Sequence, residues 1–156
     1  MSSRFPALTA DIQRQSDALS KLEEEARGLL ESGGSSPIER RAAGSILHDF
    51  YTGVEKVFQR IAIELDGGLP AGPDWHSDLL LRMTIGIEQR RPPVITEELA
   101  ERLGEYLRFR HVFRHLYGFE LRWELCRELL GDLPATLEDI RKQLRNFQDF
   151  LQAVNG

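Results

Sequence analysis

Residues 106–120 read YLRFRHVFRHLYGFE, a stretch that concentrates positive charge, imidazole and aromatic rings in a chain that is acidic as a whole. At about 100° per residue of an α-helix, its basic and imidazole side chains fall on one arc of about 160°. The apolar side chains fall on the opposite side, so the stretch predicts an amphipathic helix. The polar arc contains Arg108, Arg110, His111, Arg114, His115 and Arg122, and the apolar side contains Tyr106, Phe109, Val112, Phe113, Leu116 and Phe119.

Helical periodicity extends toward the N-terminus from this stretch. Apolar residues three and four apart predict a first helix over residues 9–31, with Thr9 as its N-cap. The segment Ser36-Pro37-Ile38-Glu39 is a capping-box pattern with proline at the first helical position. We therefore expect a long second helix to begin there and to end at Gly67-Gly68.

The remaining segments are also helical in pattern. A short helix is expected over residues 75–85 with Asp74 as its cap, and Thr96 is expected to cap the helix that contains the central stretch. Apolar spacing continues beyond Gly118, stops at Gly131-Asp132, and resumes in a final helix over residues 135–151. No stretch alternates with period two over the length of a strand. The sequence therefore predicts one all-α domain over residues 1–156, an antiparallel bundle of four to five helices.

Composition excludes several classes of function. The net charge of −5 argues against a general nucleic-acid coat, although a localised basic cleft is compatible with it. The single cysteine, Cys126, permits neither an internal disulfide nor a cysteine-based zinc site. No signal-peptide core and no apolar run long enough to cross a bilayer is present, so we expect a cytoplasmic protein without membrane contact.

The two histidines of the central stretch raise the question of a metal. His111 and His115 are four residues apart and would share one helix face, a spacing that can seat a metal ion. The arginines around them would repel a cation, and no carboxylate is placed in sequence to complete the site. We therefore predict no metal and no cofactor.

Arginine beside histidine suits a phosphodiester better. Arginine offers a planar fork of donors that matches phosphate oxygens, and histidine can take a proton from a 2′-hydroxyl and return one to a leaving 5′-oxygen. RNA can be cleaved in this way without metal because the nucleophile belongs to the substrate. The plain alternative is a solvated basic face over a buried apolar one.

Arg110, His115 and Tyr117 form an Arg-x4-His-x-Tyr arrangement within a helical bundle. This arrangement resembles the motif of the HEPN superfamily and, within it, of the HepT-like toxins. The resemblance covers most of the chain, from Tyr51, Gly53 and Glu55 on the long second helix through the link at residues 70–75 to residues 106–120. One departure is His111, where the closest relatives usually have asparagine, so that a second titratable imidazole is present.

The resemblance implies metal-independent RNA cleavage by a toxin of a type VII toxin–antitoxin pair. Arg110 would hold and neutralise the scissile phosphate, and His115 would be the general acid/base. Arg108, His111 and Arg114 would contact the RNA, with tRNA as one candidate substrate. The implied partners are a second copy of the chain, in a homodimer, and a small nucleotidyltransferase of the MntA type, which would silence the toxin by transferring AMP to Tyr117.

Geometry and composition leave several points open. On an ideal helix Arg110 and His115 lie about 140° apart, so we expect both a break of the helix near Gly118 and a second chain that supplies half of the site. Glu55 is either an exposed charge or the partner of an arginine of the central stretch. His76 is interpreted as a surface or capping residue. The competing functions are a catalytically silent HEPN-type bundle that serves as a dimerisation or partner-binding module, and an RNA- or nucleotide-binding regulator.

Overall fold

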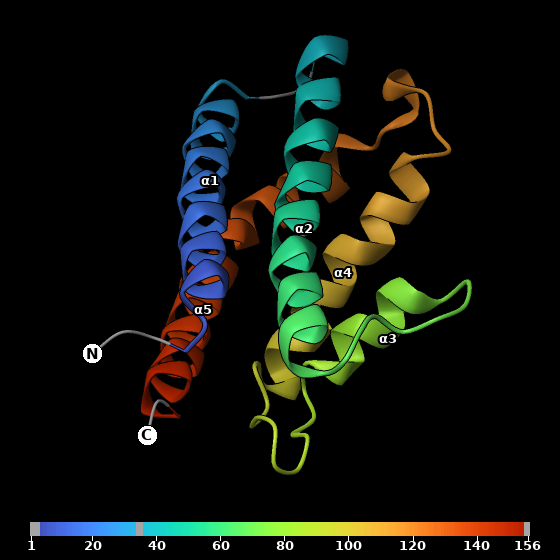
Figure 1. Ribbon diagram of the computed structural model, residues 1–156. Helices are drawn as coiled ribbons and strands as arrows, with labels where there is room; N and C mark the ends of the chain where they lie inside the picture. Colours follow the sequence, from blue (N-terminus) through green and yellow to red (C-terminus); the bar gives the residue numbers. More distant parts are fainter. Residues whose placement is uncertain (1–3, 34–35, 155–156) are drawn as a thin grey trace.

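The computed structural model describes residues 4–33 and 36–154, and it is an all-helical bundle, as predicted (Figure 1). Over these residues the only β-structure is an isolated bridge between Ile87 and Arg91. No helix in the described ranges is long and apolar enough to cross a membrane. The elements in chain order are α1 (Pro6–Glu31), α2 (Pro37–Leu65), α3 (Trp75–Arg82), α4 (Glu97–Phe113), the 3₁₀ turn η1 (Gly118–Glu120) and α5 (Trp123–Ala153).

Four of the predicted helices carry a predicted N-cap, and three of these four begin where the cap places them. The Ser36 and Thr96 hydroxyls accept hydrogen bonds from the backbone N–H groups of Glu39 and Leu99, so both predicted N-caps are confirmed. Asp74 precedes α3 but makes no capping hydrogen bond with its side chain. The prediction for α1 was wrong, because the helix begins at Pro6 rather than after Thr9. Proline suits the first helical turn, since the N–H it lacks would have no partner there.

The predicted break at Gly131-Asp132 was also wrong, because α5 runs continuously through Pro134. A proline inside a helix removes one backbone hydrogen bond and crowds the preceding turn. Leu129, Leu130, Leu133 and Leu137 are nevertheless all buried on the same helix, so the apolar contacts extend across the proline without interruption. Tertiary burial therefore outweighs the local breaker signal.

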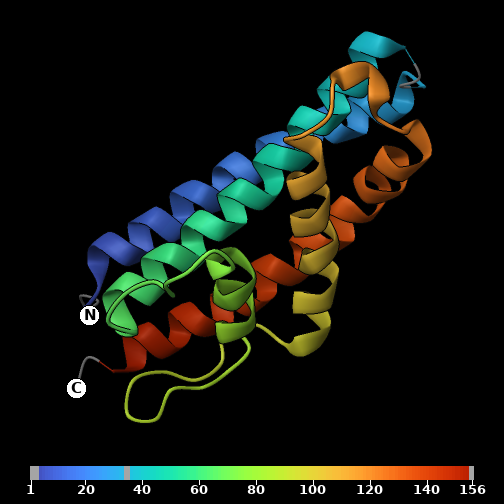
Figure 2. The same cartoon turned by 90° about the vertical axis from the view of Figure 1, so that its right-hand side faces the viewer.

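The helices pack around α2. In Figures 1 and 2, α1 and α2 form an antiparallel pair, and the start of α1 lies at the same end of the bundle as the end of α5. The second helix contacts α1, α3, α4, η1 and α5. Tyr106 fixes α4 between its neighbours: its ring packs edge-on against Phe50 at 5.0 Å, and its hydroxyl donates to the carbonyl of Leu129 at 2.7 Å. One central helix thus positions all the others.

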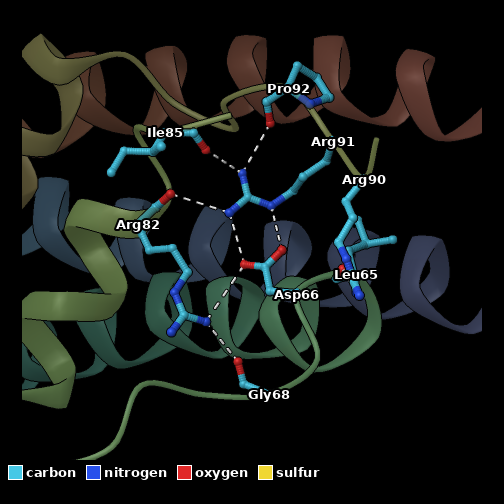
Figure 3. Close-up of polar contacts among 8 residues, drawn as sticks. All are labelled: Leu65, Asp66, Gly68, Arg82, Ile85, Arg90, Arg91 and Pro92. Carbon is cyan, nitrogen blue, oxygen red and sulfur yellow. Dashed lines mark hydrogen bonds and ion pairs between the residues drawn. The ribbon is translucent and has the colours of Figure 1, made fainter. Parts of the chain in front are cut away.

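A buried arginine holds the irregular link between α3 and α4 (Figure 3). The guanidinium of Arg91 donates two hydrogen bonds to the carboxylate of Asp66, at 2.7 and 2.9 Å, from a side chain that is fully buried. It also donates to the carbonyls of Ile85 and Pro92, while Arg82 donates to the carbonyl of Gly68. Because each charge is paired and hydrogen-bonded, the link packs firmly against the end of α2. This arrangement fixes the position of α3 relative to α4.

Candidate active site

The helix that contains the central stretch, α4, breaks before Gly118 as expected, but it ends earlier than the sequence pattern predicts. Helix α4 ends at Phe113, and residues 114–117 form a turn that leads into η1. The reason is a tight contact with α2: a Cβ on Gly44 would lie 2.4 Å from the ring of Phe113 and 2.8 Å from Leu121, and a Cβ on Gly118 would lie 2.3 Å from the side chain of Arg41. The chain therefore folds back across α2, and Leu121 enters the core.

The predicted polar arc is divided by this arrangement. Arg110 is buried, at 2% exposure, whereas Arg108, His111, Arg114 and His115 are exposed. On the side predicted to be apolar, Val112 and Phe119 are exposed. The expectation of one continuous cationic face is thus wrong, because the ideal helix does not extend to residue 120.

Arg110 lies in a buried polar cluster with α2. Its Nη2 donates to Glu55 Oε2 at 2.9 Å, its Nη1 donates to the Thr52 hydroxyl at 3.1 Å, and its guanidinium lies 4.9 Å from the centre of the Tyr51 ring. Glu55 is itself only 4% exposed, so the alternative in which it pairs with an arginine of the central stretch is confirmed. Burial, and then the charge of Glu55, raise the pKa of Tyr51 well above its usual range, and Arg110 partly opposes this shift.

His76 joins the same cluster from α3, which corrects its interpretation as a surface or capping residue. Its Nδ1 lies 2.8 Å from Glu55 Oε2 and 3.1 Å from Arg110 Nη2. The imidazole also stacks on the indole of Trp75, with 3.8 Å between ring centres. No local signal marks this position, because the link after α2 must first fold back to bring α3 against α4.

The cluster borders a groove of about 970 Å³ between α3 and α4. Helix α3 lies beside α4 in both Figures 1 and 2. The α4 wall changes sign along its length, with carboxylates near its start and basic groups near its end. These lining groups are Glu97, Glu101 and Glu105, followed by Arg108, Arg110, His111 and Arg114.

His115 and Tyr117 lie on the turn and are not among the residues that line the groove. The His115 and His111 rings meet edge to face at 5.4 Å, so the structure brings these two imidazoles together. Tyr117 is 71% exposed, and its ring stacks on Phe119 at 5.4 Å. Over residues 4–33 and 36–154, no three metal-ligating side chains form a cluster. One chain thus places Arg110 in the groove and His115 with Tyr117 beyond its edge.

Comparison with known proteins identifies the family. The profile of the HepT-like protein family matches residues 42–151, a range that covers most of α2 and all of α3, α4 and η1, and that ends within α5. No curated protein and no solved structure matches the chain. The matched range contains Glu55, His76, Arg110, His115 and Tyr117. The chain therefore belongs to the HepT-like proteins of the HEPN superfamily.

Proposed function

We propose that this protein is a metal-independent RNA endonuclease, the toxin of a type VII toxin–antitoxin pair that acts in the cytoplasm. The observation that carries the proposal is the family match over a range that includes the Arg110-x4-His115-x-Tyr117 motif. The exposure of His115 adds support, because an acid/base group must reach its substrate.

The catalytic roles follow from the chemistry of the side chains. Arg110 binds and neutralises the scissile phosphate from the end of the groove. A guanidinium has five N–H donors, and Glu55 and Thr52 each accept a hydrogen bond from one of them, so three donors remain for a phosphate. His115 is the general acid/base, and Arg108, His111 and Arg114 contact the RNA backbone along the exposed side of α4. Positive charge on Arg108 and Arg114 would steer a polyanion toward the groove.

A homodimer completes the site. Within one chain, His115 lies on the turn whereas Arg110 faces the groove, so a single copy does not direct both at one phosphate. A twofold interface that includes the end of α4 would bring the motifs of two chains together. Light scattering of the purified protein tests this state, and a monomer at micromolar concentration that retains full activity would contradict it.

Tyr117 is the point of neutralisation. A partner nucleotidyltransferase of the MntA type transfers AMP to its hydroxyl, which places a phosphate anion beside His115 and Arg114. The chain has three tyrosines, and Tyr51 and Tyr106 are buried at 0% and 1% exposure. Tyr117 is thus the only tyrosine that a modifying enzyme can reach in the folded protein. An adenylate there would occupy the space of the substrate and reduce the attraction for RNA.

The test of the enzymatic proposal is cleavage of RNA in the presence of EDTA. We expect the wild-type protein to cleave and His115→Ala to lower the rate by about 10²- to 10⁴-fold, the usual contribution of a general acid/base. Because His115 is exposed, the melting temperature should not change. His48→Ala, which removes an imidazole from α2 away from the groove, is the control and should cleave at the wild-type rate. Cleavage that stops with EDTA, or that persists in His115→Ala, would contradict the mechanism.

The burial of Arg110 favours a second candidate, a catalytically silent bundle that serves as a dimerisation or partner-binding module. A guanidinium paired with Glu55 at 2% exposure has a structural role whether or not RNA binds. The same assay separates the two functions, because a silent module leaves RNA intact under every condition.

A further inference from the structure

The cluster of Glu55, His76 and Arg110 is organised so that one imidazole nitrogen is fixed and the other is free. The His76 Nδ1 lies 2.8 Å from Glu55 Oε2. The His76 side chain is 28% exposed and lines the groove, whereas the Glu55 side chain behind it is 5% exposed. Among the described residues, no protein group hydrogen-bonds to Nε2.

The contacts assign the proton on Nδ1. An ionised carboxylate only accepts hydrogen bonds and a guanidinium only donates them, so Nδ1 cannot serve both neighbours at once. Arg110 Nη2 donates a hydrogen bond to Glu55 Oε2 at 2.9 Å. The contact of His76 Nδ1 with Glu55, at 2.8 Å, is shorter than its contact with Arg110, at 3.1 Å. Nδ1 therefore carries hydrogen and donates it to Glu55. In the neutral ring this leaves the lone pair on Nε2, on the side of the ring opposite the carboxylate.

We infer that His76 is a second acid–base residue of the ribonuclease groove, a general base oriented by Glu55 and placed beside the phosphate site at Arg110. This inference rests on the proposed function and adds a residue outside the family motif. A carboxylate on Nδ1 holds the tautomer and orientation of the ring, and it stabilises the imidazolium that forms when Nε2 accepts a proton. The stacking on Trp75 restrains the ring further.

The reaction needs two proton transfers, and the proposed homodimer would supply two separate imidazoles for them, His76 in the groove of one copy and His115 on the turn of the second copy. The 2′-oxygen of the substrate forms a bond to phosphorus as its proton passes to His76 Nε2. The bond from phosphorus to the 5′-oxygen breaks, and that oxygen takes a proton from His115. The products are a 2′,3′-cyclic phosphate and a 5′-hydroxyl, and exchange with water restores both histidines. Arg110 lines the same groove as His76 and holds the phosphate in this proposal.

Other charged groups border the same space and bear on its pH dependence. Glu55 faces His76 from α2, Arg110 and His111 line the groove from α4, and Asp74 lines it at the start of α3. Among them only His111 carries a second imidazole. A test must therefore compare the two imidazoles.

The experiment measures kcat/KM for RNA cleavage in EDTA as a function of pH, with His76→Asn as the main variant. The asparagine amide can keep a donor toward Glu55 but cannot accept and release a proton at neutral pH. We expect a fall of about 10²-fold or more at the optimum. The acidic limb of the wild-type profile should disappear, because only the neutral imidazole is a base. His48→Asn, whose Nδ1 also lies beside a carboxylate at 3.4 Å, is the matched control and should keep the wild-type profile.

The outcomes separate this inference from the proposed function. If the wild type cleaves and His115→Ala abolishes cleavage while His76→Asn keeps both rate and acidic limb, the inference fails and the function stands. An acidic limb that disappears in His111→Asn instead would also overturn it. A lower rate in His76→Asn with an unchanged limb would mean a structural role only, and the inference would again fail. If the wild type cleaves no RNA, the proposed function and the inference fail together.

Discussion

The site depends at the residue scale on two opposite charges that have left water. Arg110 and Glu55 are 2% and 5% exposed at their side chains and 2.9 Å apart. Taking two ions from water is costly, and their attraction offsets the cost only when both are present and hydrogen-bonded. Thr52 supplies one further hydrogen bond to the arginine. Loss of either charge should therefore affect folding before it affects chemistry.

A double-mutant cycle measures this effect. We expect Glu55→Leu to lower the free energy of unfolding by about 3–5 kcal/mol, because it leaves the buried guanidinium without a counter-charge. Arg110→Met should cost less than that, because His76 still donates a hydrogen bond to the Glu55 carboxylate. The double variant should lose much less than the sum. Urea unfolding gives all three values. The control is Arg108→Met, which breaks an exposed pair with Glu105 and should cost at most about 1 kcal/mol.

The cycle also bears on how activity data are interpreted. Loss of cleavage in Arg110→Met would not by itself show that the arginine binds phosphate, since the fold is weakened as well. If single variants cost no more than Arg108→Met, the pair is not buried in solution as described, and the account of the cluster is wrong.

The contact between α2 and the turn after α4 decides the geometry of the motif at the scale of elements. Gly44 lets the Phe113 ring and Leu121 approach α2 closely, and the turn that carries His115 and Tyr117 follows directly. A side chain at Gly44 would have to displace an aromatic ring that is itself packed on Phe109, with ring centres 5.8 Å apart. The turn is therefore fixed by packing rather than by its own sequence.

Gly44→Ala tests this contact. Overpacking of a close interface usually costs about 1–3 kcal/mol, so we expect a loss of that size in urea unfolding. Gly131→Ala is the control, because it lies inside α5 with no atom within 4 Å of the added methyl group. Without a clash, the change from glycine to alanine in a helix should stabilise by about 0.4–1 kcal/mol. Equal effects at the two positions would mean that the turn does not press on α2.

The same turn makes Tyr117 the modification site in our proposal. After co-expression with the partner nucleotidyltransferase, trypsin would cut after Arg114 and Arg122 and release residues 115–122, in which Tyr117 is the only tyrosine. We expect mass spectrometry to find whole AMP increments on this peptide. The buried Tyr51 and Tyr106 are internal controls and should remain unmodified. An unmodified Tyr117 in a neutralised pair would show that silencing works without AMP transfer.

Signals that act within one turn of helix could be predicted from the sequence. The caps at Ser36 and Thr96 are such signals, because each hydroxyl bonds a backbone group three residues later. A break near Gly118 was expected from the ideal-helix angles, but the exact end of α4 at Phe113 and the continuity of α5 through Pro134 could not be predicted, because both depend on contacts with α2 and the core. The pairing of Arg110 with Glu55, 55 residues away, was one of two open alternatives, and the position of His76 carried no local signal at all.

At the scale of the whole molecule, an acidic chain presents a groove between α3 and α4 that is basic near the end of α4. The net charge is −5, yet Arg108, Arg110, His111 and Arg114 gather where the groove meets the motif. Local charge rather than net charge then governs the approach of a polyanion. Two such grooves in a homodimer would face one RNA strand, and the substrate itself would supply the nucleophile.

The most direct test of this account incubates the protein in EDTA with two oligonucleotides. One is an unmodified RNA, and the other has the same sequence with a 2′-O-methyl group at every position. The account predicts that the wild-type protein cuts only the RNA and leaves a 2′,3′-cyclic phosphate and a 5′-hydroxyl, because the 2′-oxygen attacks the phosphorus. Both oligonucleotides should bind with similar affinity, since phosphate contacts do not need the 2′-hydroxyl. Cleavage of the methylated strand, or products that carry a 5′-phosphate, would contradict the account.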